Sequence, residues 1–192
     1  MKYFYNNYVV KDEDAYINGM QGETEQMGAE YASGIPMELG NLDLVYTYGE
    51  VQAHKCDWLA GIQFVPLVSE QFRKVVEAHA PGEAEFHPVR IRCEENGKED
   101  TSYSFMNLLN NVRCMDRKKS KLVLFTPGHD VVSDIKKLVL EEKAIGDRHL
   151  FRVAEFPSLI LFSEPLKEKL EAAGLSGVEW KEASGYSSVL MF

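Results

Sequence analysis

The chain has 192 residues, of which 45% are hydrophobic and 27% are charged, and its 30 acidic residues against 21 lysines and arginines give a formal net charge of −9. This composition is typical of a globular protein that buries a substantial core. The negative charge repels phosphate groups, and no apolar run approaches the ~20 residues that span a bilayer. The sequence therefore predicts no nucleic-acid partner and no membrane partner.

The cysteine content predicts the cellular compartment. Cys56, Cys93 and Cys114 are an odd number of thiols and include no Cys-x-x-Cys pair. The N-terminus also lacks the basic and then apolar order of a signal peptide. Both features indicate a reducing, cytoplasmic location.

The N-terminal part begins as a strand and continues as a loop. Aromatic and β-branched residues in 3–10 predict the strand. In residues 12–41, glycines and acids recur without a sustained apolar period, which predicts a long surface loop. Such loops often bind partners, and aromatic side chains dominate interfaces. The candidate contacts in this loop are therefore its tyrosines and acids, namely Tyr16, Glu23, Glu25 and Tyr31.

Residues 42–48 alternate apolar side chains as a half-buried strand does, and residues 64–88 then predict a strand, a helix and a second strand. Ser69 follows a short apolar run and is placed to cap a helix. Phe72 and Val76 lie at helical spacing on one apolar stripe, and a Pro-Gly pair ends the helix.

The same order recurs in residues 158–182 at a constant offset, 163 − 69 = 94 residues. Ser163 takes the capping position of Ser69, and Leu166 and Leu170 form the apolar stripe. Repetition of such a segment indicates architecture rather than chemistry, because the stripe residues are most stable when buried.

A hairpin and a basic patch lie between the two segments. Asn96-Gly97 between flanking strands predicts the hairpin turn. Residues 113–121 are basic but lack the stacking aromatics of single-strand binders, so we interpret them as a solvated turn. In this turn, Asp116 and Ser120 are expected to bond local backbone amides. Farther along, we expect a strand at residues 137–140.

These landmarks occur in a fixed order: the strand and Ser-Glu start at 67–70, the segments 82–88 and 103–110, Cys114-Met115-Asp116-Arg117 with Ser120, the strand at 151–153, Ser163-Glu164, Gly174, Gly177 and Trp180. In this order the chain resembles the bacterial immunity protein eleven family, a myxobacterial-type immunity domain of polymorphic toxin systems. The likeness covers residues 56–182. Residues 1–60 match loosely, and residues 61–182 form the family-like core.

The resemblance implies a cytoplasmic protein that binds and neutralises a cognate toxin, and it carries no catalytic residues to this chain. If the toxin is a nuclease, the acidic runs at residues 12–14 and 94–100 could imitate a phosphate backbone. The chain is also compatible with a homo-oligomer. The candidate partner-binding residues are Tyr16, Glu23, Glu25, Tyr31, Asp116 and Arg117.

A catalytic function has less support in the residues. No Gly-x-Ser-x-Gly elbow is present, and His54 and Cys56 stand one residue apart without a His-x-x-x-His or Cys-x-x-Cys pair to bind zinc. Glycines match neither the phosphate loop nor the dinucleotide fingerprint. We therefore predict no enzyme, metal or cofactor. The alternatives are a structural subunit and a small hydrolase or nucleotide-handling enzyme with a site near Asp116, Arg117 and His87.

The expected fold class is α+β. A mostly antiparallel sheet is assembled around the two related strand-helix-strand segments, 64–88 and 158–182, and carries a long N-terminal loop region. We expect residues 1–192 to form one domain.

Overall fold

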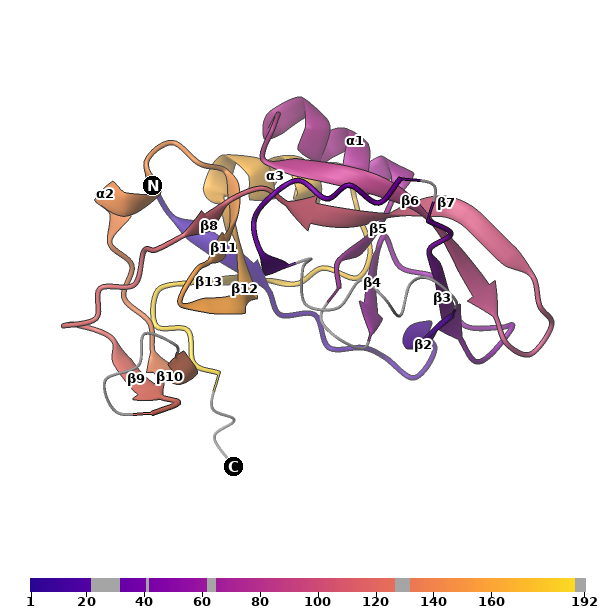
Figure 1. Ribbon diagram of the computed structural model, residues 1–192, viewed down its shortest axis with the longest axis horizontal. Helices are drawn as coiled ribbons and strands as arrows, with labels where there is room; N and C mark the ends of the chain where they lie inside the picture. The colour runs from indigo at the N-terminus through magenta and orange to yellow at the C-terminus, as the bar shows by residue number, and fades with distance from the viewer. Residues whose placement is uncertain (22–31, 41, 62–64, 127–131, 189–192) are drawn as a thin grey trace.

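The computed structural model describes residues 1–21, 32–40, 42–61, 65–126 and 132–188. Strands outnumber helices in these residues and form a closed barrel, a five-stranded sheet and a two-stranded sheet. The barrel and the five-stranded sheet lie side by side along the long axis of the molecule, with the two longer helices on one side of them (Figure 1). The α+β class is confirmed.

The barrel closes in the strand order β2-β3-β6-β7-β5-β4. Its strands are β2 (Tyr16–Gln21), β3 (Val45–Tyr48), β4 (Trp58–Gly61), β5 (Leu67–Ser69), β6 (Ala84–Cys93) and β7 (Glu99–Leu108). Strands β6 and β7 form a hairpin, and Gly97 in its turn has a φ of 69°. This left-handed backbone favours glycine, so the hairpin predicted at Asn96-Gly97 is confirmed.

The five-stranded sheet has the order β13-β1-β12-β11-β8. Its strands are β1 (Tyr3–Asn6), β8 (Asn111–Val112), β11 (Leu150–Val153), β12 (Phe156–Ser163) and β13 (Trp180–Glu182). The hairpin of β9 (Lys121–Leu124) and β10 (Val132–Lys137) and the short helix α2 (Glu142–Ile145) pack against one face. The β2–β4, β3–β6 and β11–β8 pairings are parallel, and the other pairings of named strands are antiparallel, as the sequence predicts.

Both longer helices begin at the serines that the sequence indicates. Helix α1 (Glu70–His79) follows Ser69, whose Oγ accepts a hydrogen bond from Phe72 N at 3.2 Å. Helix α3 (Glu164–Ala172) follows Ser163, whose Oγ accepts from Leu166 N at 3.3 Å. Each serine satisfies an amide that the helix itself leaves without a partner. No helix in the described part of the chain is long and apolar enough to cross a membrane.

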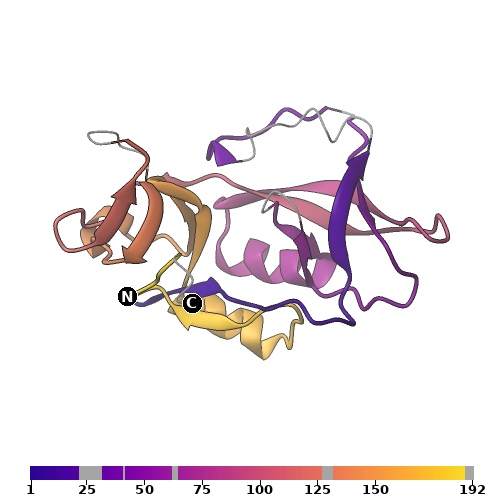
Figure 2. The same ribbon diagram turned by 90° about the horizontal axis from the view of Figure 1, so that it is seen from below.

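The two strand-helix-strand segments share a local topology. Helix α1 connects β5 to β6, and β7 lies between these strands, antiparallel to both. Helix α3 connects β12 to β13, and β1 lies between them in the same way. The helices pack side by side (Figure 2). Gln71 Nε2 of α1 donates to the Ala173 carbonyl after α3 at 3.0 Å.

Residues 159–162 of strand β12 are apolar without interruption because both faces of the strand are covered there. Leu159 and Leu161 belong to the apolar cluster shared with the β9–β10 hairpin and α2. Ile160 and Phe162 belong to the cluster on the opposite face, under α1 and α3. Successive side chains of a strand point to opposite faces, so a strand covered on both sides is apolar at every position.

The cluster under α1 and α3 joins the barrel to the five-stranded sheet. It combines side chains of β5, α1 and β7 with side chains of β11, β12 and α3. Its most deeply buried members include Val68, Phe72, Met106, Leu108, Leu150, Phe162 and Leu170. The apolar stripes of the two helices therefore stabilise the junction between the sheets.

The structure differs from the predicted elements in three places. Within the segment predicted as the N-terminal loop, β2 forms a barrel strand that buries Ile17. Strand β3 is buried at all four positions rather than on alternate ones. Strand β10 ends at Lys137, where the predicted strand at residues 137–140 begins, and α2 follows.

Candidate functional site

A cleft of about 740 Å³ lies between the barrel and the five-stranded sheet. Its walls come from β1 and the residues after it, β2, β4, β12 and the residues after β13. Most of the large side chains that line it are aromatic, namely those of Tyr5, Tyr8, Tyr16, Trp58, Phe156, Phe162 and Tyr186. A concave surface with this lining is typical of a binding site.

The aromatic residues are held by contacts with the strands around them. The Tyr5 ring meets the Tyr186 ring edge to face, with centroids 4.8 Å apart. Trp58 packs in the same way against Phe162 at 6.1 Å. By contrast, Tyr16 keeps 47% of its surface exposed. The cleft thus has a fixed aromatic base and an accessible tyrosine at its edge.

One hydrogen bond controls the protonation of two groups beside the cleft. The Tyr8 hydroxyl donates to Asp14 Oδ2 at 2.5 Å, and this bond raises the pKa of Tyr8 above its usual range. The same bond is the main reason that the pKa of Asp14 is lowered to about 2, against the opposing effect of burial. Tyr8 is therefore a neutral donor and Asp14 a carboxylate at neutral pH.

A model of the immunity protein family Imm11 matches residues 6–185. The chain belongs to this immunity protein family. The match includes the N-terminal residues that resemble the family only loosely by their motifs, and it spans the barrel, the cleft and both longer helices. No curated protein matches the chain.

The predicted partner-binding residues that the structure describes fall in two regions of this immunity protein. Tyr16 begins β2 and lines the cleft. Glu23, Glu25 and Tyr31 lie outside the described residues. The cleft aromatics Trp58, Phe156 and Tyr186 were missed, because each belongs to a different segment and no local pattern links them.

Asp116 and Arg117 lie in the turn between β8 and β9. Asp116 Oδ1 accepts hydrogen bonds from the backbone amides of Lys118 and Lys119, both at 3.1 Å, and Ser120 Oγ donates to the Val139 carbonyl. The side-chain bond from Lys119 is the main cause of the lowered pKa of Asp116. The expected local bonds are therefore confirmed for Asp116. The prediction is wrong for Ser120, because its hydroxyl bonds the backbone of the distant Val139.

His87 does not join Asp116 in a catalytic group. His87 belongs to β6 of the barrel, where its Nε2 lies 3.0 Å from Glu85 Oε1 and its ring stacks on Phe105 at 5.9 Å. The turn that holds Asp116 lies beyond the five-stranded sheet, next to the β9–β10 hairpin (Figure 1). The geometry on which the hydrolase alternative depends is therefore not formed by these residues.

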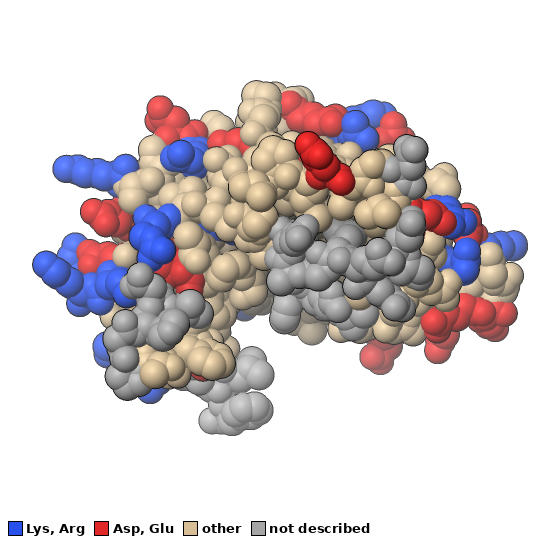
Figure 3. All heavy atoms as spheres, in the orientation of Figure 1, with Lys and Arg blue, Asp and Glu red and all other residues tan. Residues whose placement is uncertain are grey.

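The acidic run at residues 94–100 of the immunity protein is partly neutralised by nearby cations. Glu99 pairs with Arg90 at 2.8 Å and with Arg92 at 2.5 Å, and Asp100 pairs with Lys55. Acidic and basic side chains lie next to one another at both ends of the molecule (Figure 3). Internal pairing leaves fewer carboxylates available for imitating a phosphate backbone than the sequence suggests.

Proposed function

We propose that this immunity protein binds a cognate bacterial toxin in the cytoplasm and thereby neutralises it. The observation that carries the proposal is the family match over residues 6–185. The three cysteines are free and buried, which supports a reducing compartment. Neutralisation by binding requires a complementary surface rather than a set of catalytic groups.

The aromatic cleft is the surface we assign to the toxin. Tyr16 and Val9 are exposed at its edge, at 47% and 71% of their surface. Aromatic side chains that insert into pockets of the partner contribute much of the binding energy of protein interfaces. A toxin segment entering the cleft would contact the barrel and the five-stranded sheet together, because both line it.

Co-expression with the toxin gene next to the immunity gene tests this proposal. The wild-type chain should restore the growth of cells that make the toxin, and the two proteins should co-purify. Tyr16→Ala should weaken the complex by ~30-fold, which is the effect of losing an interface anchor worth ~2 kcal/mol. Phe125→Ala is the control, since Phe125 is 78% exposed and does not line the cleft.

The outcomes distinguish two claims, namely that the protein neutralises the toxin and that the cleft is the surface that binds it. Growth arrest that persists while both proteins accumulate would contradict toxin neutralisation. Rescue by the wild-type chain, with Tyr16→Ala unaffected and Phe125→Ala weakened, would retain the function and exclude the cleft. Calorimetry on the purified proteins distinguishes weaker binding from poorer folding of a variant.

A further inference from the structure

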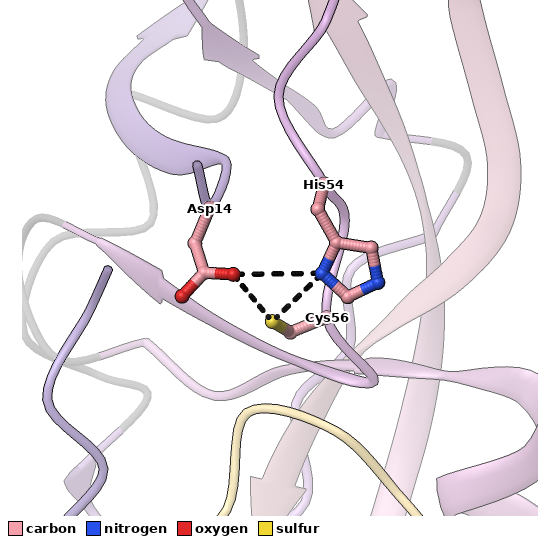
Figure 4. A group of neighbouring side chains, drawn as sticks. All are labelled: Asp14, His54 and Cys56. Carbon is pink, nitrogen blue, oxygen red and sulfur yellow. Dashed lines mark hydrogen bonds and ion pairs between the residues drawn. The ribbon is translucent and has the colours of Figure 1, made fainter. Parts of the chain in front are cut away.

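Three potential metal ligands from two distant segments meet beside Tyr8. Asp14 precedes β2, whereas His54 and Cys56 lie in the segment before β4. Their side chains point toward one another (Figure 4). Cys56 is 4% exposed and the side chain of Asp14 is 5% exposed, whereas the side chain of His54 is 59% exposed. The group is thus largely buried, and solvent reaches it at the exposed His54 side chain.

The three ligand atoms form a nearly equilateral triangle. Asp14 Oδ1 lies 3.4 Å from Cys56 Sγ and 3.5 Å from His54 Nδ1, and the sulfur lies 3.5 Å from the same nitrogen. In tetrahedral zinc sites the ligands lie ~2.0–2.3 Å from the metal, which places neighbouring ligand atoms ~3.3–3.6 Å apart. The observed edges therefore match one face of a zinc tetrahedron.

Surrounding hydrogen bonds hold the ligands in this arrangement. The second carboxylate oxygen of Asp14 accepts from the Tyr8 hydroxyl at 2.5 Å and from Lys11 N at 2.9 Å, so Oδ1 is the oxygen directed at the triangle. The backbones of Asp14 and His54 form a bridge, and the Tyr103 hydroxyl donates to the Cys56 carbonyl at 3.0 Å. Partners of this kind fix ligand orientation in known metal sites.

We propose that Asp14, His54 and Cys56 bind a zinc ion through Oδ1, Nδ1 and Sγ. The thiolate and imidazole ligands favour zinc over magnesium or calcium, which prefer oxygen ligands throughout. Binding converts the Cys56 thiol to a thiolate and releases its proton to solvent. Three protein ligands leave a fourth position for water. The site adjoins the cleft through Tyr8, but zinc binding does not require the toxin.

The sequence spacing did not reveal this site. His54 and Cys56 are one residue apart, which is not a zinc-binding spacing by itself, and Asp14 is supplied by a segment forty residues earlier in the chain (54 − 14 = 40). Asp14 stands in an acidic run whose other members, Asp12 and Glu13, are exposed. Only the bridge between the two backbones places it beside the imidazole.

Cobalt substitution in the tag-free protein tests the proposal directly. One equivalent of Co²⁺ should produce thiolate-to-cobalt absorption together with the visible bands of tetrahedral cobalt, and Zn²⁺ should displace both. Tyr8→Phe should weaken zinc affinity by ~10–100-fold, because it removes the group that orients Asp14. Cys56→Ser and His54→Ala should each have a larger effect and abolish, respectively, the thiolate band and tetrahedral binding.

Two variants control for the loss of any thiol or imidazole. Cys93→Ser changes a buried thiol whose Sγ donates to the Gly49 carbonyl at 3.5 Å, and His79→Ala changes an exposed histidine of α1. Both should retain the cobalt spectrum. Absence of a thiolate band in the folded wild-type protein, or a band that survives Cys56→Ser, would overturn the proposal and leave the Cys56–Asp14 contact as a hydrogen bond only.

Discussion

At the scale of single residues, Asp57 connects two segments that are far apart in the chain. Its carboxylate accepts from Ser69 Oγ at 2.6 Å and from Ser176 N and Oγ, both at 2.8 Å. Ser69 is also the cap of α1, so one carboxylate links the start of this helix to the loop before β13. Burial raises the pKa of Asp57, but the hydrogen bonds from Ser176 and Ser69 outweigh it and lower the pKa.

We expect Asp57→Ala to lower the free energy of unfolding by ~2–3 kcal/mol, because it removes several hydrogen bonds to a charged acceptor. Urea denaturation followed by circular dichroism measures the change. Asp12→Ala removes an exposed carboxylate and should alter the free energy of unfolding by less than ~0.5 kcal/mol.

The effect of Asp57→Ala should depend on pH. The pKa of Asp57 is lower in the folded chain than the value near ~4 of an unfolded chain, so the ionised carboxylate stabilises the folded state. This contribution is fully present above pH ~4 and is lost as the pH falls through the folded pKa. The difference between wild type and variant should therefore shrink in acid, and a constant difference would contradict this account.

At the scale of secondary-structure elements, closure of the barrel depends on a close approach of β4 to β2. The two strands are parallel, and Ile17 pairs with Gly61. A Cβ atom on Gly61 would lie 2.4 Å from Ile17 Cβ and 2.8 Å from the Ile17 carbonyl oxygen. Glycine therefore permits the strand spacing that closes the barrel.

Gly61→Ala should destabilise the protein by ~1–3 kcal/mol, the usual cost of forcing an extra carbon into a packed site. Gly49→Ala is the matched control, because the nearest atom to its added Cβ is Asn18 Nδ2 at 3.9 Å. Thermal denaturation of both variants measures the effect. Equal decreases in Tm for Gly61→Ala and Gly49→Ala would show that the close approach of β4 to β2 does not require a glycine.

At the scale of the whole molecule, the junction between barrel and sheet centres on Phe162. Its ring contacts Trp58 of the barrel at 6.1 Å and Trp180 of the five-stranded sheet at 4.9 Å, both edge to face. Phe162 is completely buried in the cluster under α1 and α3. Because this cluster is shared, the barrel and the sheet stabilise one another.

We expect the barrel and the sheet to unfold in one transition. Tryptophan fluorescence, which reports on the junction, and far-ultraviolet circular dichroism, which reports on all strands and helices, should give coincident denaturation curves. Phe162→Ala should lower the stability by ~3–5 kcal/mol. Two separate transitions in the wild-type chain would show that the barrel and the sheet are independent domains.

The sequence predicts helix starts and turns most accurately. Ser69 and Ser163 cap their helices, and Gly97 forms its hairpin turn, because each feature depends on hydrogen bonds or dihedral angles within a few residues. Tyr16 was predicted as a loop residue and instead begins a strand, since its partner Ala60 in β4 comes from a distant segment.

The sequence by itself determined the α+β class, the acidic charge, both long helices and, through the order of its landmarks, membership of the immunity protein family. Only the tertiary structure decided that the strands divide between a barrel and a sheet, that a cleft opens between them, and that Asp14 meets His54 and Cys56. The physical reason is the sequence separation of the interacting residues. Caps and turns depend on residues close in the chain, whereas barrel closure and side-chain clusters depend on packing between distant segments.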